Sequence, residues 1–337
     1  METPTSPSPA TPWAILATIP RDSATDAGAD LSLTPAAPPR VTILTVPRRI
    51  SPDPTTPRNF PSVVASDPSG LLLFSATQGR PTGPLVPVIG GDLATLLCFS
   101  SDFGEWAEKD IEYPIPGRPW GSHSVISHQG KLWWVDLTLG LLTCDPFDDM
   151  PVLRFVPLPE GKALPCDVFG GGGDEVDKCR WVQVSDGKIR FVEISPGVEP
   201  RVRMWTLAEP EAGQWAPEFD VASMRFGSYK KTGLTEKIPV LALVHPKNPD
   251  VVYFFLEEHL FGADMRAKRV VECDAYELIE PPSDIVSSRF VLAWELPPAL
   301  TSGRDAEAHA CGRPDLPAVV HSGNVRLTGR KDAQPSS

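Results

Sequence analysis

The sequence lacks long apolar runs, a leader segment and a cysteine framework, and each of these absences excludes a class of protein. No apolar run approaches the roughly 20 residues that a membrane-spanning helix needs. Residues 1–12 are polar and proline-rich, unlike the apolar centre of a signal peptide. The six cysteines form no Cys-x-x-Cys pair, and no Asn-x-Ser/Thr sequon occurs. We therefore expect a soluble protein without a membrane partner in a reducing compartment, the cytoplasm or the nucleus.

Clusters of positive charge are also scarce. The chain has 43 acidic and 31 basic residues, which gives a net charge of -12. The pairs Arg48-Arg49 and Lys230-Lys231 are too short to form a basic surface and are read as solvated turns. Binding to a phosphate backbone requires clustered Lys and Arg, so we expect no nucleic-acid partner.

The sequence motifs of common enzymes are missing. Neither Gly-x-Ser-x-Gly nor His-Glu-x-x-His occurs. The glycine run Gly170–Gly173 is followed by Asp174 and Glu175, whereas a phosphate-binding loop continues with Lys and Ser or Thr. Acidic groups at that point oppose an anion, so the run is interpreted as a flexible loop. The motifs indicate neither a catalytic residue nor a cofactor site.

Metal-ligand spacings are equally weak. His123 and His128 are five residues apart, so on one strand their side chains point to opposite faces. We interpret them as turn and surface histidines. Cys166 and Cys179 can approach across the glycine run, but two further zinc ligands are not suitably spaced. The sequence therefore predicts no metal site.

What the chain does contain is a loose internal repeat of roughly 58 residues, within the range of propeller repeats. An alternating apolar run that ends in a turn recurs at Ser124–Lys131, Trp181–Lys188 and Val240–Lys247. Each run is followed by a second apolar strand and then by two more. Four short strands per repeat are typical of a β-propeller blade. Frequent prolines, 39 in all, favour many short elements joined by rigid turns.

The repeat defines the expected organisation of the chain. Residues 1–12 are expected to be disordered, residues 13–300 to form an all-β propeller-like array of four-stranded antiparallel blades, and residues 301–337 to be a mostly disordered tail. The candidate blades lie near 61–112, 123–157, 180–220 and 239–276.

The first candidate blade departs from the pattern. Its opening hairpin and its later strands are clear, but the Gly/Pro-rich stretch Gln78–Asp92 between them is too long for a hairpin turn. Our hypothesis is that about one blade of chain is missing here, either from the gene or from its annotated coding sequence. The array would then be incomplete, with at least one open sheet edge.

The amino-acid sequence of several segments resembles the DUF1618 family, a group of grass proteins of unknown function. The segments are Lys131–Leu137, Gly140–Pro146, Ile238–Phe255 and Arg289–Pro298, and the N-terminal Trp13–Arg21 is similar to the same family. The resemblance covers about residues 13–300 and implies a plant protein, from a grass. Family members look longer between Gln78 and Ala94, where the repeat is also irregular. A weaker similarity links the chain to the propellers that follow F-box motifs. No catalytic residues are implied.

Two functions from different classes remain open. The favoured one is a non-catalytic protein-binding or scaffold module, because propeller loops gather on one face and bind partners. The alternative is a propeller enzyme that acts on a small or glycosidic substrate, which requires convergent carboxylates or histidines in a cavity. The expected partner surface comprises three connections between blades, near 112–122, 158–179 and 221–238. Its named residues are Arg118, Trp120, Asp174, Glu175, Lys230 and Lys231.

Overall fold

The computed structural model describes residues 13–22, 31–47, 50, 61–66, 72–75, 93–100, 105–118, 120–165, 173–195, 200–222, 238–276 and 291–297. The regular secondary structure of these residues is almost entirely β-strand, with 61% strand against 3% helix, which confirms the all-β prediction. Three four-stranded antiparallel sheets follow one another along the chain. Their strands are β9 (Ser124–His128), β10 (Lys131–Asp136), β11 (Gly140–Cys144) and β12 (Arg154–Pro157); β13 (Arg180–Ser185), β14 (Lys188–Ser195), β15 (Arg201–Glu209) and β16 (Gln214–Ala222); and β17 (Val240–Val244), β18 (Val251–Leu256), β19 (His259–Asp264) and β20 (Arg269–Ala275).

Tight turns join the first two strands in two of these blades. Gln129 and Gly130 between β9 and β10 have positive φ angles of 52° and 74°, and Asp186 and Gly187 between β13 and β14 have 50° and 67°. Two successive left-handed residues match the twist of a hairpin, and glycine adopts that conformation without strain. The turn that ends each run in the sequence is therefore a two-residue hairpin turn in these two blades.

A fourth sheet joins the two ends of the described chain. It contains β1 (Trp13–Ala17), β2 (Arg21–Asp22), β3 (Ser32–Thr34), β4 (Val41–Val46) and the late strand β21 (Val291–Glu295). Strand β21 pairs with β1 in antiparallel fashion, β1 and β2 each pair with β4 in parallel, and β3 pairs with β4 in antiparallel fashion. The last described strand thus completes a sheet that the first strands begin.

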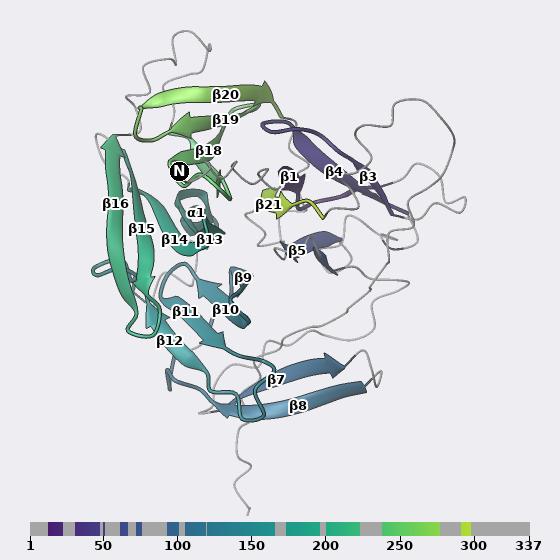
Figure 1. Cartoon of the computed structure of the whole chain (residues 1–337), viewed down its shortest axis with the longest axis vertical. Helices are drawn as coiled ribbons and strands as arrows, with labels where there is room; N and C mark the ends of the chain where they lie inside the picture. Colours follow the sequence, from purple (N-terminus) through teal and green to yellow (C-terminus); the bar gives the residue numbers. More distant parts are fainter. Residues whose placement is uncertain are drawn as a thin grey trace, which may run out of the picture.

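The sheets surround a common axis and the innermost strands close a ring (Figure 1). Going around it, β9 contacts β13, β13 contacts β17, β17 contacts β21, β21 contacts β5 (Ser62–Ser66), and β5 contacts β9. The array is a β-propeller, as the repeat predicted. The ring depends on β21, because this strand fills the position between β17 and β5.

Residues 61–112 form two hairpins that belong to separate sheets. One is β5 with β6 (Leu72–Ser75), and the other is β7 (Leu93–Ser100) with β8 (Glu105–Glu112). Within the described residues, β6 and β7 are not paired with each other. The stretch 78–92, where the missing segment was placed, lies outside the described residues, as do 1–12 and 301–337. The missing-blade hypothesis and the two disordered ends therefore stay predictions.

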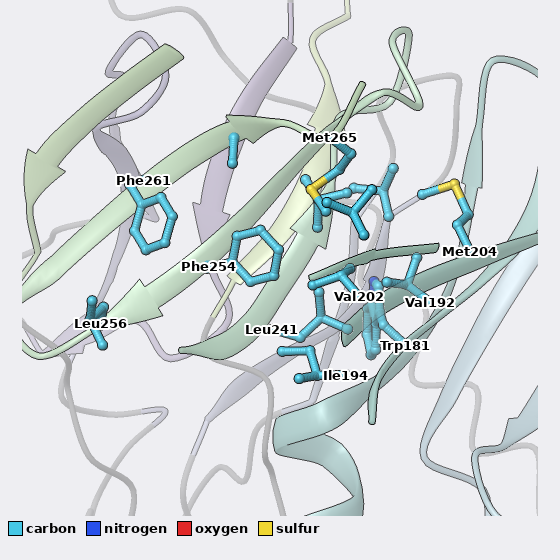
Figure 2. Packing of buried hydrophobic residues seen from close by; sticks show 14 residues of the cluster. Trp181, Val192, Ile194, Val202, Met204, Leu241, Phe254, Leu256, Phe261 and Met265 are labelled. Atoms are coloured by element: carbon cyan, nitrogen blue, oxygen red, sulfur yellow. The ribbon is translucent and has the colours of Figure 1, made fainter. Parts of the chain in front are cut away.

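Large side chains at equivalent positions fill the spaces between neighbouring sheets. Trp134, Phe191 and Phe254 each occupy the same repeat position and are at most 3% exposed. Trp134 packs towards the β7–β8 hairpin, Phe191 towards the β9–β12 blade and Phe254 towards the β13–β16 blade. Figure 2 shows Phe254 and Phe261 of one blade together with Val192 and Met204 of the preceding one. The stability of the ring therefore resides in these cores between blades.

Close packing also fixes the outer strands of the β9–β12 blade. A Cβ atom on Gly140 would lie 2.4 Å from the carbonyl oxygen of Val156 and 2.6 Å from the ring of Phe155. Only glycine permits this approach of β11 to β12. The loop between these two strands, which carries the candidate site, is thus held between closely packed strands.

One helix was not predicted. The connection from β12 to β13 was expected to be a loop with a flexible glycine run, but Gly173–Cys179 form the short helix α1. Val176 and Asp177 of α1 are buried, and α1 contacts β13, β14 and β17. Tertiary packing therefore stabilises a helix that local propensity does not indicate. In the described part of the chain, helices that combine the length and apolar character of a membrane span are absent.

Candidate functional site

Among the described residues, the most exposed large apolar side chains lie in the loop between β11 and β12, residues 145–153, which we call the apolar turn. Phe147 is 88% exposed, Met150 81% and Val152 64%. At the end of the same turn, Leu153 is only 5% exposed and packs into the core beside Trp134 and Leu142. The turn is thus anchored at one end while its apolar side chains extend into solvent.

Three side chains hold the backbone of the apolar turn in place. The carboxylate of Asp145 accepts a hydrogen bond from the Phe147 N–H at 2.9 Å, and that of Asp148 accepts one from the Met150 N–H at 3.2 Å. Such Asx turns replace a backbone turn with a local side-chain bond. From β8, Lys109 donates to the carbonyl oxygens of Asp148 at 2.7 Å and Pro146 at 3.4 Å. The exposed side chains are therefore presented on a fixed backbone.

Such an arrangement is suited to protein recognition. Large aromatic side chains dominate the energetics of many interfaces, and methionine adapts to irregular partner surfaces. A backbone that is already ordered loses little entropy on binding. Asp145, Asp148 and Asp149 are exposed and alternate with the apolar residues, so the turn combines apolar contacts with negative charge.

Beside the apolar turn, a pocket opens between the β9–β12 blade and the β15–β16 turn. Its cavity volume is about 410 Å³, and Trp133, Thr143 and Leu153 are among its lining residues. At its rim, Lys131 of β10 and Arg154 of β12 both bind the carboxylate of Glu211 from the neighbouring blade. The hydrogen bond from Lys131, together with the charges of Lys131 and Arg154, holds the pKa of Glu211 below its ordinary value.

A second group of polar side chains is buried near α1. His123 lies between Asp136 and Asp177, with Nδ1 3.9 Å from the Asp136 carboxylate and Nε2 3.6 Å from that of Asp177. The Asp136 carboxylate accepts hydrogen bonds from the N–H and hydroxyl of Thr138, at 2.8 and 2.6 Å, and His123 Nδ1 accepts from the Leu137 N–H at 3.3 Å. These bonds fix the turn between β10 and β11, which is a structural role.

The interpretation of His123 as a surface histidine is therefore wrong, since its side chain is only 14% exposed. The sequence placed His123 and His128 on opposite faces of a strand, and it gave no sign of Asp177, which lies in α1. Among the residues that the structure describes, no group of His, Cys, Asp and Glu has the arrangement of a metal site.

The residues of the predicted partner surface are only partly described. Trp120 is half-buried and packs against the cluster that contains Trp134 and Leu142. Arg118 is also half-buried and donates to the carbonyl oxygen of Leu164 at 3.4 Å, which joins two of the three predicted connections.

Asp174 and Glu175 lie in α1, and their side chains are outside the described set, as are Lys230 and Lys231 entirely. The binding role of this surface, which comprises Arg118, Trp120, Asp174, Glu175, Lys230 and Lys231, stays a prediction.

Sequence reasoning missed the apolar turn although a signal was present. Asp145-Pro146 and Asp148-Asp149 are turn formers, and Phe147 and Met150 stand between them where a loop has no core to enter. A large apolar residue between turn-forming acidic residues therefore indicates an exposed apolar side chain in a loop.

The chain is a β-propeller whose β11–β12 loop presents an exposed apolar surface. Residues 134–253 match the model of a family described as "Protein of unknown function (DUF1618)". No curated protein matches the sequence.

Three solved structures that are similar to this chain are the following. AztD from Citrobacter koseri has 14% identity and a TM-score of 0.28, covering 61% of this chain and 51% of that one, so this chain spans about half its length. A chain of a nidogen/laminin complex has 8% identity and a TM-score of 0.27, covering 66% and 91%. The β-propeller domain of Myceliophteria thermophila Cps50 (Swd1) has 8% identity and a TM-score of 0.29, covering 70% and 92%.

Proposed function

We propose that this chain is a non-catalytic protein-binding module that holds its partner at the apolar turn. The observation that carries the proposal is the combination of high exposure with a fixed backbone at Phe147 and Met150. Burying one such side chain contributes about 2 kcal/mol, so the two together contribute about 4 kcal/mol, or roughly a thousandfold in Kd. Outside the apolar turn, the most exposed large apolar side chain among the described residues is Ile238, at 54%.

The partner that fits this surface carries apolar side chains together with positive charge. Asp145, Asp148 and Asp149 surround the apolar residues along the turn, and the whole chain has a net charge of -12. Complementary charge speeds encounter and selects partners more than it strengthens the final complex. The apolar contacts would supply the affinity and the acids would select a basic segment.

The enzyme alternative is supported less well. Its requirement is a set of reactive groups that face a substrate cavity. The nearest arrangement is His123 with Asp136 and Asp177, but none of the three lines the pocket beside the apolar turn. Asp136 and His123 instead bind backbone groups of a tight turn.

We also propose a protein family and a cellular compartment for this chain. The match over residues 134–253 supports assignment of the whole propeller to the DUF1618 family. The grass origin rests on the sequence resemblance over residues 13–300 alone. The proposed setting is a reducing compartment, the cytoplasm or the nucleus, where a free thiol such as that of Cys273 is expected.

The double variant Phe147→Ser with Met150→Ser should lose the partner without losing the fold. Both side chains are exposed in the free protein, so we expect the melting temperature to change by no more than about 1 °C, as for other surface substitutions. Affinity purification of tagged protein from cells of the source organism should show at least one co-purifying protein depleted about tenfold or more.

The matched control replaces apolar residues elsewhere on the surface. Ile238 and Val271 are 54% and 44% exposed and lie away from the apolar turn in the sequence. The variant Ile238→Ser with Val271→Ser should retain every partner. If both double variants retain all partners equally, the apolar turn is not the binding surface.

A further inference from the structure

The pocket beside the apolar turn has the features of a ligand site that is already occupied by a side chain of the same molecule. Its floor is one face of the β9–β12 blade. Trp133 pairs with Thr143, and Thr143 pairs with Arg154, in the registers of the two strand pairs. Directly opposed residues lie on one face of a sheet, so these three side chains form a row across the blade. Lys131 precedes Trp133 by two positions and lies on the same face.

We propose that this pocket binds a small carboxylic acid with an aromatic or apolar body. The recognition of a carboxylate is already visible, because Glu211 places its own carboxylate against both cations. Lys131 Nζ lies 2.8 Å from one oxygen, and Arg154 Nη1 binds the other. The Glu211 carboxylate therefore marks where the carboxylate of a ligand would sit.

The internal carboxylate is easily displaced. The side chains of Lys131, Glu211 and Arg154 are 35%, 63% and 58% exposed, and ion pairs of that exposure contribute little to stability. Glu211 lies on the turn between β15 and β16, which ends at Gly213 with a φ of +64°. A ligand that brings its own carboxylate thus replaces the Glu211 pair while adding contacts inside the pocket.

A buried hydroxyl inside the pocket supports a ligand there. Thr143 is 4% exposed, lines the pocket, and its Oγ1 has no hydrogen-bond partner among the described residues. A buried hydroxyl without a partner destabilises the free protein, so it is a group that a ligand can satisfy. Trp133, 3% exposed, supplies an aromatic surface beside it for the body of the ligand.

The test measures the binding of 2-naphthoate to the full chain by titration calorimetry at low ionic strength, where exposed charges are least screened. Glu211→Gln removes the competing charge, so we expect it to tighten naphthoate binding about tenfold. Arg154→Gln should weaken binding about tenfold or more for the loss of a charge-assisted contact. The neutral analogue 2-naphthamide should bind equally to wild type and Glu211→Gln.

Two further variants separate a binding role from a structural one. Thr143→Val keeps the shape and removes the unpaired hydroxyl, so it should leave stability unchanged or raised; 6-hydroxy-2-naphthoate, whose ring hydroxyl can accept from Thr143, should bind this variant about threefold or more weakly than wild type. Arg266 is 60% exposed, close to the 58% of Arg154, and binds Asp250 outside the pocket, so Arg266→Gln should leave binding unchanged.

Naphthoate affinity that is the same in wild type, Glu211→Gln and Arg154→Gln would overturn the proposal. So would an absence of binding in both wild type and Glu211→Gln while the variants remain folded.

Discussion

Ending the chain at residue 290 should abolish cooperative unfolding, whereas ending it at residue 300 should leave the melting transition in place. The shorter chain loses β21, which pairs with β1 along five residue pairs and lies between β17 and β5 in the ring. Val291, Trp294 and Leu296 are at most 4% exposed. Burial of three such side chains contributes about 6 kcal/mol, which is comparable to the roughly 5–15 kcal/mol that stabilises a whole domain.

The two truncations differ by only ten residues, so they control for the loss of the C-terminal segment. The longer one keeps every described strand. Near-ultraviolet circular dichroism and calorimetry should show one sharp transition for the chain ending at 300 and none for the chain ending at 290. Two truncated chains with the same melting temperature would show that β21 does not close the ring.

Replacing Phe254 by alanine should lower the free energy of unfolding by about 3–5 kcal/mol. Phe254 is fully buried, and its ring stacks on Phe261 with centroids 5.5 Å apart. It fills the space between the β13–β16 and β17–β20 blades, so its removal leaves a cavity that two packed sheets cannot easily close (Figure 2).

The control variant is Val271→Ala in the same blade, where the side chain is 44% exposed. Its free energy of unfolding should fall by no more than about 0.5 kcal/mol. Urea unfolding gives both values if the slope m is unchanged. A loss below about 1 kcal/mol for Phe254→Ala would mean that the cores between blades do not determine stability.

Much of the propeller could be predicted because its signals are local. The alternating runs placed the first strand of three blades closely, because the runs that begin at Ser124, Trp181 and Val240 correspond to β9, β13 and β17, which begin at Ser124, Arg180 and Val240. Adjacent residues of a strand point to opposite faces of the sheet. Trp133 and Trp134 follow this rule, since both are 3% exposed and they belong to different cores.

The closure of the ring could not be predicted in the same way. Trp13 pairs with Glu295 across most of the chain, and no local pattern records which strand lies beside which. The helix α1 was missed for a related reason. Its seven residues gain stability from the packing of Val176 and Asp177 against three strands, so its sequence alone favours a loop.

The apolar turn was not predicted because the expected partner surface was built from charged and aromatic residues in the longest connections. Trp120 satisfied that criterion and lies half-buried against a core. Phe147 and Met150 stand in a shorter loop, whose backbone is held by the Asx turns at Asp145 and Asp148 and by hydrogen bonds from Lys109. The hydrogen bond from Lys109 to Asp148 joins β8 to the apolar turn across 39 residues, and a local sequence pattern does not reveal such a contact.

The most direct test of the central claim is site-specific photocrosslinking from the apolar turn. A photoreactive phenylalanine analogue is placed at Phe147, at Arg118 on the predicted connection surface, or at Val271 as an exposed reference. After irradiation in cells of the source organism, mass spectrometry identifies what each position has captured. The account predicts that position 147 captures one defined partner and that positions 118 and 271 do not. Capture of that partner from position 118 and not from position 147 would contradict it.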